Sequence, residues 1–481
     1  MGKYLYGAAV QGIQDFIFKT NELGHIVGAS ELVEQICTSA FDEFASNGES
    51  VVRAAGNIKL IFDNEADCRK AVREFPRKVM KMAPGITISQ AVVPLDDDFG
   101  KAVDQIESLL KVQRNKPQRS VTSGLMGIKR TNDTGLPTVR VTDTDNYKDE
   151  PTIQKECFLN TRGLCEKSFG IHPLHKSSIA FNISDITEKN DWIAIIHADG
   201  NGLGKVVQAI GKNKDAFRSF SQQLDIATKE AAQIAFAAVE KMFKGTKIIP
   251  IRPVVLGGDD MTVIIRGDIA IVYANAFIKA FEEKTQELLG DILSEHQVFA
   301  DGKDYLTACA GVAFIKSSYP FYYGYQLAKE LCDHAKKDTK AIYGAETNHL
   351  PSSCLLFHKV QDSFIISYED IIKKELTAKD GLSFKAGPYY ITPQDGKKTV
   401  TDLTEACKLL NRENGDGIKS GIRNWISLRL GDKNKADQRR ERMRQIFSDP
   451  DIIEELTCET NNQCIAFDVL AYNTIMNQQT K

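Results

Sequence analysis

The sequence predicts an α+β protein in which two tandem ferredoxin-like units precede an α-helical C-terminal domain. The same order of apolar strands and amphipathic helices occurs twice, in residues 4–93 and 192–314. After about residue 367 the apolar spacing becomes helical. The length of 481 residues also favours about three domains over one.

Each copy opens on an apolar strand that runs into a glycine. Residues 4–12 (Tyr-Leu-Tyr-Gly-Ala-Ala-Val-Gln-Gly) and 192–200 (Trp-Ile-Ala-Ile-Ile-His-Ala-Asp-Gly) share this shape. A stretch with apolar residues at spacings of three and four follows in each copy, and this spacing predicts a helix. The apolar residues are Leu32, Val33 and Ile36 in the first copy and Ala232, Ile234, Val239 and Met242 in the second.

A hairpin of two short strands comes next in both copies. The first hairpin turns at Ala-Ala-Gly-Asn (54–57) and the second at Gly-Gly-Asp-Asp (257–260). A helix (65–82 and 269–289), a strand (86–93 and 306–313) and a last amphipathic helix then complete each copy. The order β-α-β-β-α-β is that of a ferredoxin-like unit. The palm domains of nucleotide-polymerising enzymes share it, so we read the first copy as a degenerate palm and the second as a catalytic one.

The remaining segments divide the chain into four parts. The polar stretch between the copies, rich in Thr, Asn, Asp and Gly, is typical of an irregular connector. Helical spacing marks the C-terminal part, at Leu403, Leu409, Leu410, Ile422, Trp425, Ile426 and Leu428. The predicted parts are the degenerate palm (1–116), the connector (117–190), the catalytic palm (191–360) and the α-helical domain (361–481).

Composition indicates a soluble cytoplasmic protein. With 61 basic and 64 acidic residues the net charge is −3, which excludes a bulk polycation that coats nucleic acid. No apolar run approaches the roughly 18 residues that span a bilayer, and the N-terminus resembles no signal peptide. The ten cysteines form no C-x-x-C pair, so we expect reduced thiols and no structural zinc site.

Three carboxylates of the second copy form the predicted catalytic and metal site. Asp199 ends the first strand, and Asp259 and Asp260 lie in the hairpin turn. In a ferredoxin-like sheet the first strand neighbours that hairpin, so the three acids can converge. Rigid strand ends are suited to holding two metal ions, and Mg²⁺ prefers oxygen ligands. The pattern therefore predicts a two-metal site for Mg²⁺ or Mn²⁺ that acts on a nucleoside triphosphate.

Glycines around these acids predict nucleotide binding. The loop after Asp199 opens a helix, and its backbone N–H groups can cradle a triphosphate. Lys336, at the end of the last helix, could reach the terminal phosphates as a mobile charge. The predicted nucleotide-binding residues are Gly200, Asn201, Gly202, Gly204, Gly257, Gly258 and Lys336. Taken singly, each motif has a plainer interpretation as a surface turn, a calcium-like loop or a solvated helix end, and His197 is expected to pack rather than to bind metal.

The first copy lacks these acids. Gln11 stands where the second copy has Asp199, and Gly56 and Asn57 stand where it has Asp259 and Asp260. The first copy either holds a second nucleotide, with help from Arg114 and Lys116, or is purely architectural.

These residues resemble a known family. Ile-His-Ala-Asp-Gly-Asn-Gly-Leu-Gly (196–204) with Leu-Gly-Gly-Asp-Asp (256–260), preceded by a degenerate palm, is similar to the CRISPR-associated palm/cyclase proteins. These are the large subunits of type III CRISPR complexes. The resemblance implies conversion of ATP into cyclic oligoadenylate messengers in antiviral defence, with metal held by the residues matching Asp199, Asp259 and Asp260. It also implies crRNA, target RNA and other CRISPR subunits as partners, and an attacking 3′-hydroxyl held near the degenerate palm.

Departures from that family leave alternatives. No His-Asp doublet occurs, so we expect no HD nuclease, and zinc cysteines between the palms are missing. The chain is short for the family, which leaves a stand-alone cyclase open. A catalytically silent structural subunit of an RNA-guided complex is the main alternative; a template-dependent polymerase lacks support. The basic stretch 429–444 has seven Lys or Arg against three acids and is either a solvated helix face or a contact for RNA or a subunit.

Overall fold

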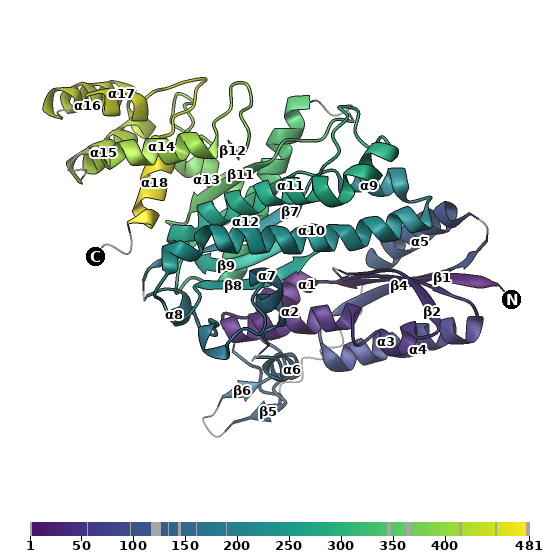
Figure 1. Cartoon of the computed structure of the whole chain (residues 1–481). Helices are drawn as coiled ribbons and strands as arrows, with labels where there is room; N and C mark the ends of the chain where they lie inside the picture. The colour runs from purple at the N-terminus through teal and green to yellow at the C-terminus, as the bar shows by residue number, and fades with distance from the viewer. Residues whose placement is uncertain are drawn as a thin grey trace.

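The computed structural model contains a four-stranded, a six-stranded and a small two-stranded sheet, flanked by helices (Figure 1). It describes residues 2–54, 56–96, 98–116, 127–132, 134–142, 146–159, 161–188, 190–343, 348–361, 367–412, 416–447 and 450–477.

The first unit is built on the four-stranded sheet. Its strands lie in the order β2-β3-β1-β4, which is the strand order of a ferredoxin-like unit. The elements are β1 (Lys3–Gln11), α1 (Ile13–Phe18), α2 (Leu23–Cys37), α3 (Asp42–Ala45), β2 (Gly48–Ala54), β3 (Asn57–Phe62), α4 (Glu65–Met82), β4 (Thr87–Leu95) and α5 (Phe99–Arg114).

The second unit repeats this order and extends it. Its sheet runs β12-β11-β10-β7-β9-β8, in which β12 (Tyr389–Tyr390) comes from the C-terminal part, and its first four strands in the chain have the same ferredoxin-like arrangement. The long helices α10 and α11 pack against each other, and α12 packs against β10, β7 and β11. The elements are β7 (Trp192–Gly200), α9 (Leu203–Ile210), α10 (Lys214–Glu240), η2 (Lys241–Phe243), β8 (Ile251–Gly257), β9 (Asp260–Arg266), η3 (Gly267–Ile269), α11 (Ala270–Glu295), β10 (Ala308–Lys316), α12 (Phe321–Tyr343) and β11 (Cys354–Lys359).

Two irregularities occur at the same place in both units. The hairpin β2–β3 shifts register between Ser50 and Val52, and the hairpin β8–β9 shifts register between Pro253 and Val255. Each bulge lies three residues before the last residue of its strand. In addition, a glycine in the left-handed conformation caps the first helix of each unit, Gly12 with φ 66° and Gly202 with φ 81°. Shared bulges are features that related structures retain, so they support the internal repeat.

The sequence analysis predicted an irregular connector, but the structure shows regular elements in part of it. It contains a β5–β6 hairpin and short helices. Helix α6 packs on α2 of the first unit, and α7 packs on α10 and β8 of the second. The segment was misjudged because its helices are short and their apolar faces too small to give a periodic signal. The elements are β5 (Arg140–Val141), β6 (Tyr147–Lys148), α6 (Glu150–Glu156), α7 (Gly163–Phe169), η1 (Lys176–Ser178) and α8 (Ile183–Ile186).

The C-terminal part is mainly helical but also supplies a strand. Strand β12 pairs with β11 and so completes the second sheet, a contact that the helical prediction lacked. Two residues are too short a strand to leave a period-two pattern. Because connector and C-terminal segments both pack on the second unit, the exact domain boundaries stay a prediction. The elements are α13 (Tyr368–Glu375), β12 (Tyr389–Tyr390), α14 (Val400–Leu410), α15 (Asp416–Gly431), α16 (Lys433–Ile446), α17 (Pro450–Leu456) and α18 (Ala466–Met476).

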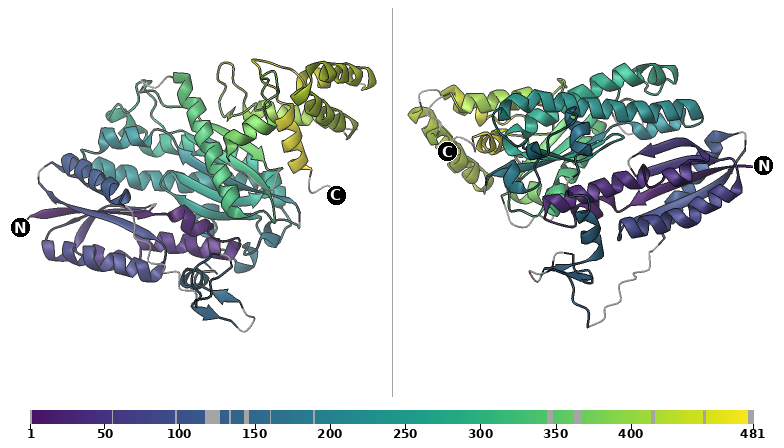
Figure 2. Two further views of the ribbon diagram at one scale, coloured as in Figure 1. Left: turned by 180° about the vertical axis from the view of Figure 1, so that it is seen from behind. Right: turned by 60° about the horizontal axis from the view of Figure 1, so that its bottom comes forward.

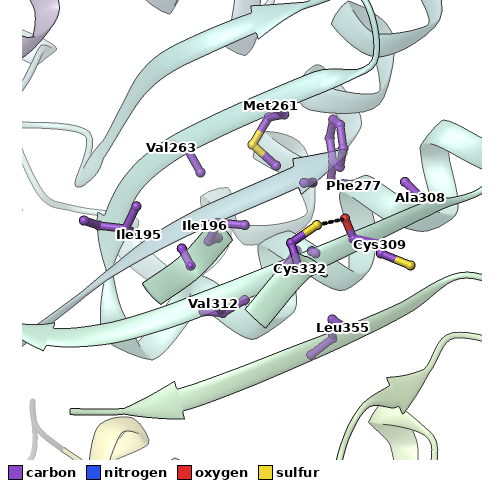
Figure 3. Packing of buried hydrophobic residues seen from close by; sticks show 14 of the residues in the cluster. Ile195, Ile196, Met261, Val263, Phe277, Ala308, Cys309, Val312, Cys332 and Leu355 are labelled. Atoms are coloured by element: carbon purple, nitrogen blue, oxygen red, sulfur yellow. Dashed lines mark hydrogen bonds between the residues drawn. The ribbon is translucent and has the colours of Figure 1, made fainter. Parts of the chain in front are cut away.

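The core of the second unit fixes the strands that carry the site. Side chains from β7, β9 and β10 interdigitate with residues of α11 and α12 (Figure 3). Cys332 of α12 donates its Sγ–H to the Cys309 carbonyl at 3.2 Å. All ten cysteines are free thiols, as expected. Among the described helices, none is both long and apolar enough to span a bilayer.

Candidate active site

The three predicted carboxylates converge at one edge of the second sheet. Asp199 lies at the end of β7, and β7 pairs with β9 through Ala198 and Met261, the residue after Asp260. One carboxylate oxygen from each of Asp199, Asp259 and Asp260 lies within 4.8 Å of the others. Within the described residues this is the one group of at least three His, Cys, Asp or Glu side chains close enough to hold a metal ion. The chain segments around it bring three oxygen ligands to one point, which suits a hard divalent cation.

Glycine is required at two positions of this edge. Gly258 has φ 62°, a left-handed conformation that the turn needs. A Cβ added to Gly200 would lie 2.8 Å from the Asp259 Cβ, so a side chain there would displace the carboxylate. The Gly-Gly-Asp-Asp turn is therefore a tight turn in which backbone and carboxylates crowd together.

Charge crowding marks the site electrostatically. Burial is the main cause that raises the pKa of Asp259, and the negative charges of Asp260 and Asp199 add to it. Burial and the Asp199 charge likewise raise the pKa of Asp260, against which Lys336 and Lys329 act. Carboxylates held this close favour a bound cation, because a cation would offset both the repulsion and the loss of hydration.

Lys336 is fixed within the site. Its Nζ lies 2.5 Å from Asp199 Oδ2 and donates to the Gly200 carbonyl at 2.8 Å. Burial lowers the pKa of Lys336, but the charge and hydrogen bond of Asp199 outweigh burial, and the net shift is upward. The sequence analysis placed Lys336 near the phosphates as a mobile charge that closes its helix. Two parts of that expectation differ from the structure: α12 continues to Tyr343, and the lysine is held by its ion pair with Asp199.

The loop after Asp199 contains a residue that is buried and hydrogen-bonded within the protein, Asn201, and a glycine with free space around it, Gly204. Asn201 is buried, donates its main-chain N–H to the Thr307 carbonyl at 2.8 Å, and donates its Nδ2 to Thr307 Oγ1 and Cys309 Sγ. Its amide is thus used within the protein, and the expectation that it binds phosphate is not supported by this geometry. Gly202 is the N-cap of α9, and a Cβ added at Gly204 would meet no atom within 4 Å.

The Gly-Gly-Asp-Asp turn is held from behind by residues that the sequence analysis missed. Lys167 of α7 donates from Nζ to the Leu256 carbonyl at 3.0 Å and pairs with Asp225 at 3.2 Å. Thr228 of α10 donates from Oγ1 to the Gly258 carbonyl at 2.5 Å. The contacts join residues far apart in sequence. The only local hint was a hydroxyl, Thr228, on an otherwise apolar helix face.

A cavity of about 460 Å³ lies between the two units, and Asp260 is the one residue of the carboxylate cluster that lines it. Its walls come from α1 and α2 of the first unit, α7 of the connector, and β8, β9 and α12 of the second, and include Gly257 and Asp260. The two units meet beside it, where Phe18 stacks on Tyr325 with ring centroids 4.2 Å apart and Lys329 donates to Gln14 Oε1 at 3.2 Å. Arg114 and Lys116 are described but are not among the residues that line the cavity.

His197 packs in the cavity wall, as expected. Its Nδ1 lies 3.1 Å from Thr262 Oγ1, and its ring meets the Tyr325 ring edge-on. Burial lowers its pKa to about 4, which keeps the imidazole neutral at neutral pH.

The strand register corrects one comparison between the units. Ala198 pairs with Met261, one residue after the turn, and Ala8 pairs with Ile58, one residue after the equivalent turn. Ala9, not Gln11, is therefore the counterpart of Asp199. The left-handed glycines agree, since Gln11 precedes Gly12 as Asn201 precedes Gly202. The sequence comparison was shifted by two residues, which leaves strand periodicity unchanged and so could not be noticed from the pattern.

Comparisons with known proteins agree with this geometry. Residues 192–342 match the model of the Cas10/Cmr2 second palm domain. The whole chain is similar in fold to the crystal structure of a Csm1–Csm4 cassette in complex with cA4, with TM-score 0.57, 14% identity, and coverage of 99% of this chain and 69% of the other. Another similar structure is the Csm1–Csm4 subcomplex of the type III-A CRISPR-Csm interference complex, with TM-score 0.55, 14% identity, and coverage of 98% and 70%. A search of curated protein sequences found no significant match.

Fold and site together describe a protein that contains a palm-like domain with three clustered carboxylates at one edge of its sheet. The family match is more specific but covers only part of the chain: residues 192–342 resemble the second palm domain of Cas10/Cmr2.

Proposed function

We propose that this protein is a metal-dependent nucleotidyltransferase that converts ATP into a cyclic oligoadenylate messenger in a type III CRISPR-like defence. The observation that carries this proposal is the convergence of Asp199, Asp259 and Asp260 beside the cavity between the two units. A cavity of this size is in the range of small-molecule sites, and it places a substrate within reach of the carboxylates.

The carboxylates are the proposed ligands of two Mg²⁺ or Mn²⁺ ions. When bound, these ions would supply Lewis-acid stabilisation of charge at the reacting phosphate. Besides the proposed metal, Asp199 has Lys336 as an ion-pair partner. A shift of that lysine toward phosphate would leave the Asp199 carboxylate free to bind the metal. Gly202 and Gly204, on either side of Leu203 at the N-terminus of α9, have no side chains that would keep a ligand from the backbone N–H groups, an arrangement suited to a triphosphate.

The first unit is proposed to be a degenerate palm that holds the acceptor nucleotide. Its α1 and α2 line the same cavity as Gly257 and Asp260. An acceptor there could direct its 3′-hydroxyl at the α-phosphorus of a donor in the second unit, with pyrophosphate as the leaving group. Such a transfer depends mainly on positioning and on charge stabilisation, which the carboxylate edge and Lys336 would supply.

Solved structures of similar fold suggest where the protein works. They are structures of Csm1–Csm4 cassettes with one ATP or with cA4, and of a subcomplex of the type III-A interference complex. We therefore propose ATP as substrate, a Csm4-like subunit as partner, and crRNA with target RNA as the activating assembly, in the cytoplasm.

The test is to incubate the purified chain with each nucleoside triphosphate and Mg²⁺ or Mn²⁺, alone and with added RNA and partner subunit. Products are identified by mass spectrometry. We expect cyclic oligoadenylates from ATP, with Asp259→Asn/Asp260→Asn as the matched inactive control. If the wild-type chain gives no product under any of these conditions, the alternative of a catalytically silent subunit replaces the proposal.

A further inference from the structure

Helix α4 of the first unit carries a mainly basic outer face, on which Glu74 is an exposed acid beside the cations. Its buried side is apolar, and its outer side has five exposed Lys or Arg side chains. Four of these follow one another at intervals of four residues, which in a helix forms one stripe about 18 Å long. The buried residues are Cys68, Ala71, Phe75 and Val79, and the exposed cations are Arg69, Lys70, Arg73, Arg77 and Lys81.

Most of these cations are not neutralised by the protein. Arg69 pairs with Glu65 on the same helix at 2.6 Å, and in the described part of the chain no carboxylate forms an ion pair with the other four. The basic stretch 429–444 of the C-terminal part is different. There Arg429 is buried between Glu459 and Asp380, Arg440 pairs with Asp437, and Arg444 pairs with Glu441. Much of that stretch is thus structural, whereas on α4 the five exposed cations outnumber the two exposed acids, Glu65 and Glu74, in a chain with a net charge of −3.

The platform beneath this face is rigid. Pro76 has no N–H, and the Val72 carbonyl that it leaves without a helical partner accepts from Gln90 Nε2 at 2.8 Å. The Asn64 side chain caps the helix by accepting from the Asp67 N–H at 2.9 Å. The Phe75 ring packs edge-on against Phe41 with centroids 4.7 Å apart. A fixed array of cations loses less entropy on binding than a flexible one.

The basic face is open and lies apart from the active site. Helix α4 packs on β1, β3, β4 and α3 within its own unit. Figures 1 and 2 show it along the outer side of the first unit, away from the second unit. None of its five exposed cations lines the cavity between the units.

We propose that the outer face of α4 binds the phosphodiester backbone of a nucleic acid strand, independently of base sequence. Arginine, which supplies three of the five cations, binds phosphate through paired N–H groups. A protein partner would require an apolar or aromatic centre, and Met80 is the one large apolar side chain exposed on this face. A membrane surface would require an exposed apolar face, but the apolar side of α4 is buried in the first unit.

The test is the salt dependence of binding by the full-length protein. Fluorescently labelled single-stranded RNA and DNA of equal length are titrated with wild type and with Arg73→Gln/Arg77→Gln/Lys81→Gln. For single strands the slope of log affinity against log salt is about −0.7 per phosphate neutralised, so three lost contacts should reduce its magnitude by about 2. That change corresponds to roughly a hundredfold weaker binding at about 0.1 M salt.

The matched control is Lys433→Gln/Lys435→Gln/Arg442→Gln in α16, which removes the same charge elsewhere. We expect it to leave the slope near the wild-type value, and we expect both variants to keep the wild-type melting temperature and the rate of nucleotide conversion. An unchanged slope in the α4 variant, or an equal change in the α16 control, would overturn the proposal. A loss confined to RNA would overturn backbone recognition in favour of contacts to the 2′-hydroxyl. Because binding is measured without nucleotide substrate, failure of the proposed enzymatic function would not affect the result.

Discussion

The two units of this protein share their backbone and differ in what their strand ends carry. Both have the same strand order, the same bulge before the hairpin turn, and a left-handed glycine before the first helix. Even the amide before that glycine is used alike, since Gln11 donates to Ser89 and Asn201 donates to Cys309 on the neighbouring strand. The same backbone arrangement can therefore carry different functional side chains, and the function of each unit depends on those side chains.

The difference is confined to a few positions. Ala9, Gly56 and Asn57 occupy the places of Asp199, Asp259 and Asp260. Crowded carboxylates cost stability unless a cation offsets them, so one unit bears that cost and the other does not.

The largest expected effect comes from making the second unit resemble the first. Asp259→Asn/Asp260→Asn should reduce product formation by about a thousandfold or more, because metal ligands contribute several kcal/mol of charge stabilisation in the transition state. Without metal, the variant should melt at a higher temperature than wild type, since the crowding that raises both pKa values is gone. Product analysis and thermal melting with and without Mg²⁺ test both parts. Wild-type turnover in the folded variant would contradict the site assignment.

Lys336→Ala should have the next largest effect. Loss of a charge-assisted contact to phosphate corresponds to roughly ten- to a hundredfold in apparent affinity for ATP. Because Lys336 also pairs with Asp199, the metal-free variant should melt at a lower temperature, and Mg²⁺ should restore part of the loss. The neighbouring Lys337 is exposed, so Lys337→Ala is the matched control and should change neither property. If ATP dependence is the same in Lys336→Ala and wild type, Lys336 has no role in substrate binding.

The sequence predicted the strands and helices of both units closely, because long apolar runs and helical spacings do not depend on distant contacts. It also predicted that Asp199 would meet Asp259 and Asp260, because strand order in this topology follows from the order of elements. The orientation of individual side chains could not be predicted from the sequence. The inward turn of Asn201 and the ion pair of Lys336 depend on neighbours far along the chain, such as Thr307 and Asp199.

The metal-free protein should lose stability as pH rises from about 4 to about 8. The raised pKa values, about 8 for Asp259 and about 7 for Asp260 against 3.8 when unfolded, mean that the folded state binds more protons in this window. Stability therefore falls with rising pH, whereas a salt-bridged carboxylate would show the opposite trend. Melting temperatures of wild type minus those of Asp259→Asn/Asp260→Asn, measured across this range in chelator, isolate the effect. We expect the difference to become more negative with pH and to disappear with saturating Mg²⁺; a flat difference would show that the carboxylates are not crowded.

The smallest expected change in activity is that of the reverse exchange. Ala9→Asp/Asn57→Asp puts carboxylates at two of the three corrected positions, and Gln11→Asp/Asn57→Asp is its control with the first acid two residues too far along the strand. Neither variant should form more product than wild type. Ala9 is only 3% exposed, so an added carboxylate there would be buried. The Ala9 variant should instead melt at a lower temperature, by an amount typical of a buried unpaired charge.

Turnover per chain and melting temperature are compared for the three proteins, again with and without Mg²⁺. A doubling of turnover in the Ala9 variant alone would show that the first unit kept every other part of a working site. The missing carboxylates would then be the only functional difference between the two units.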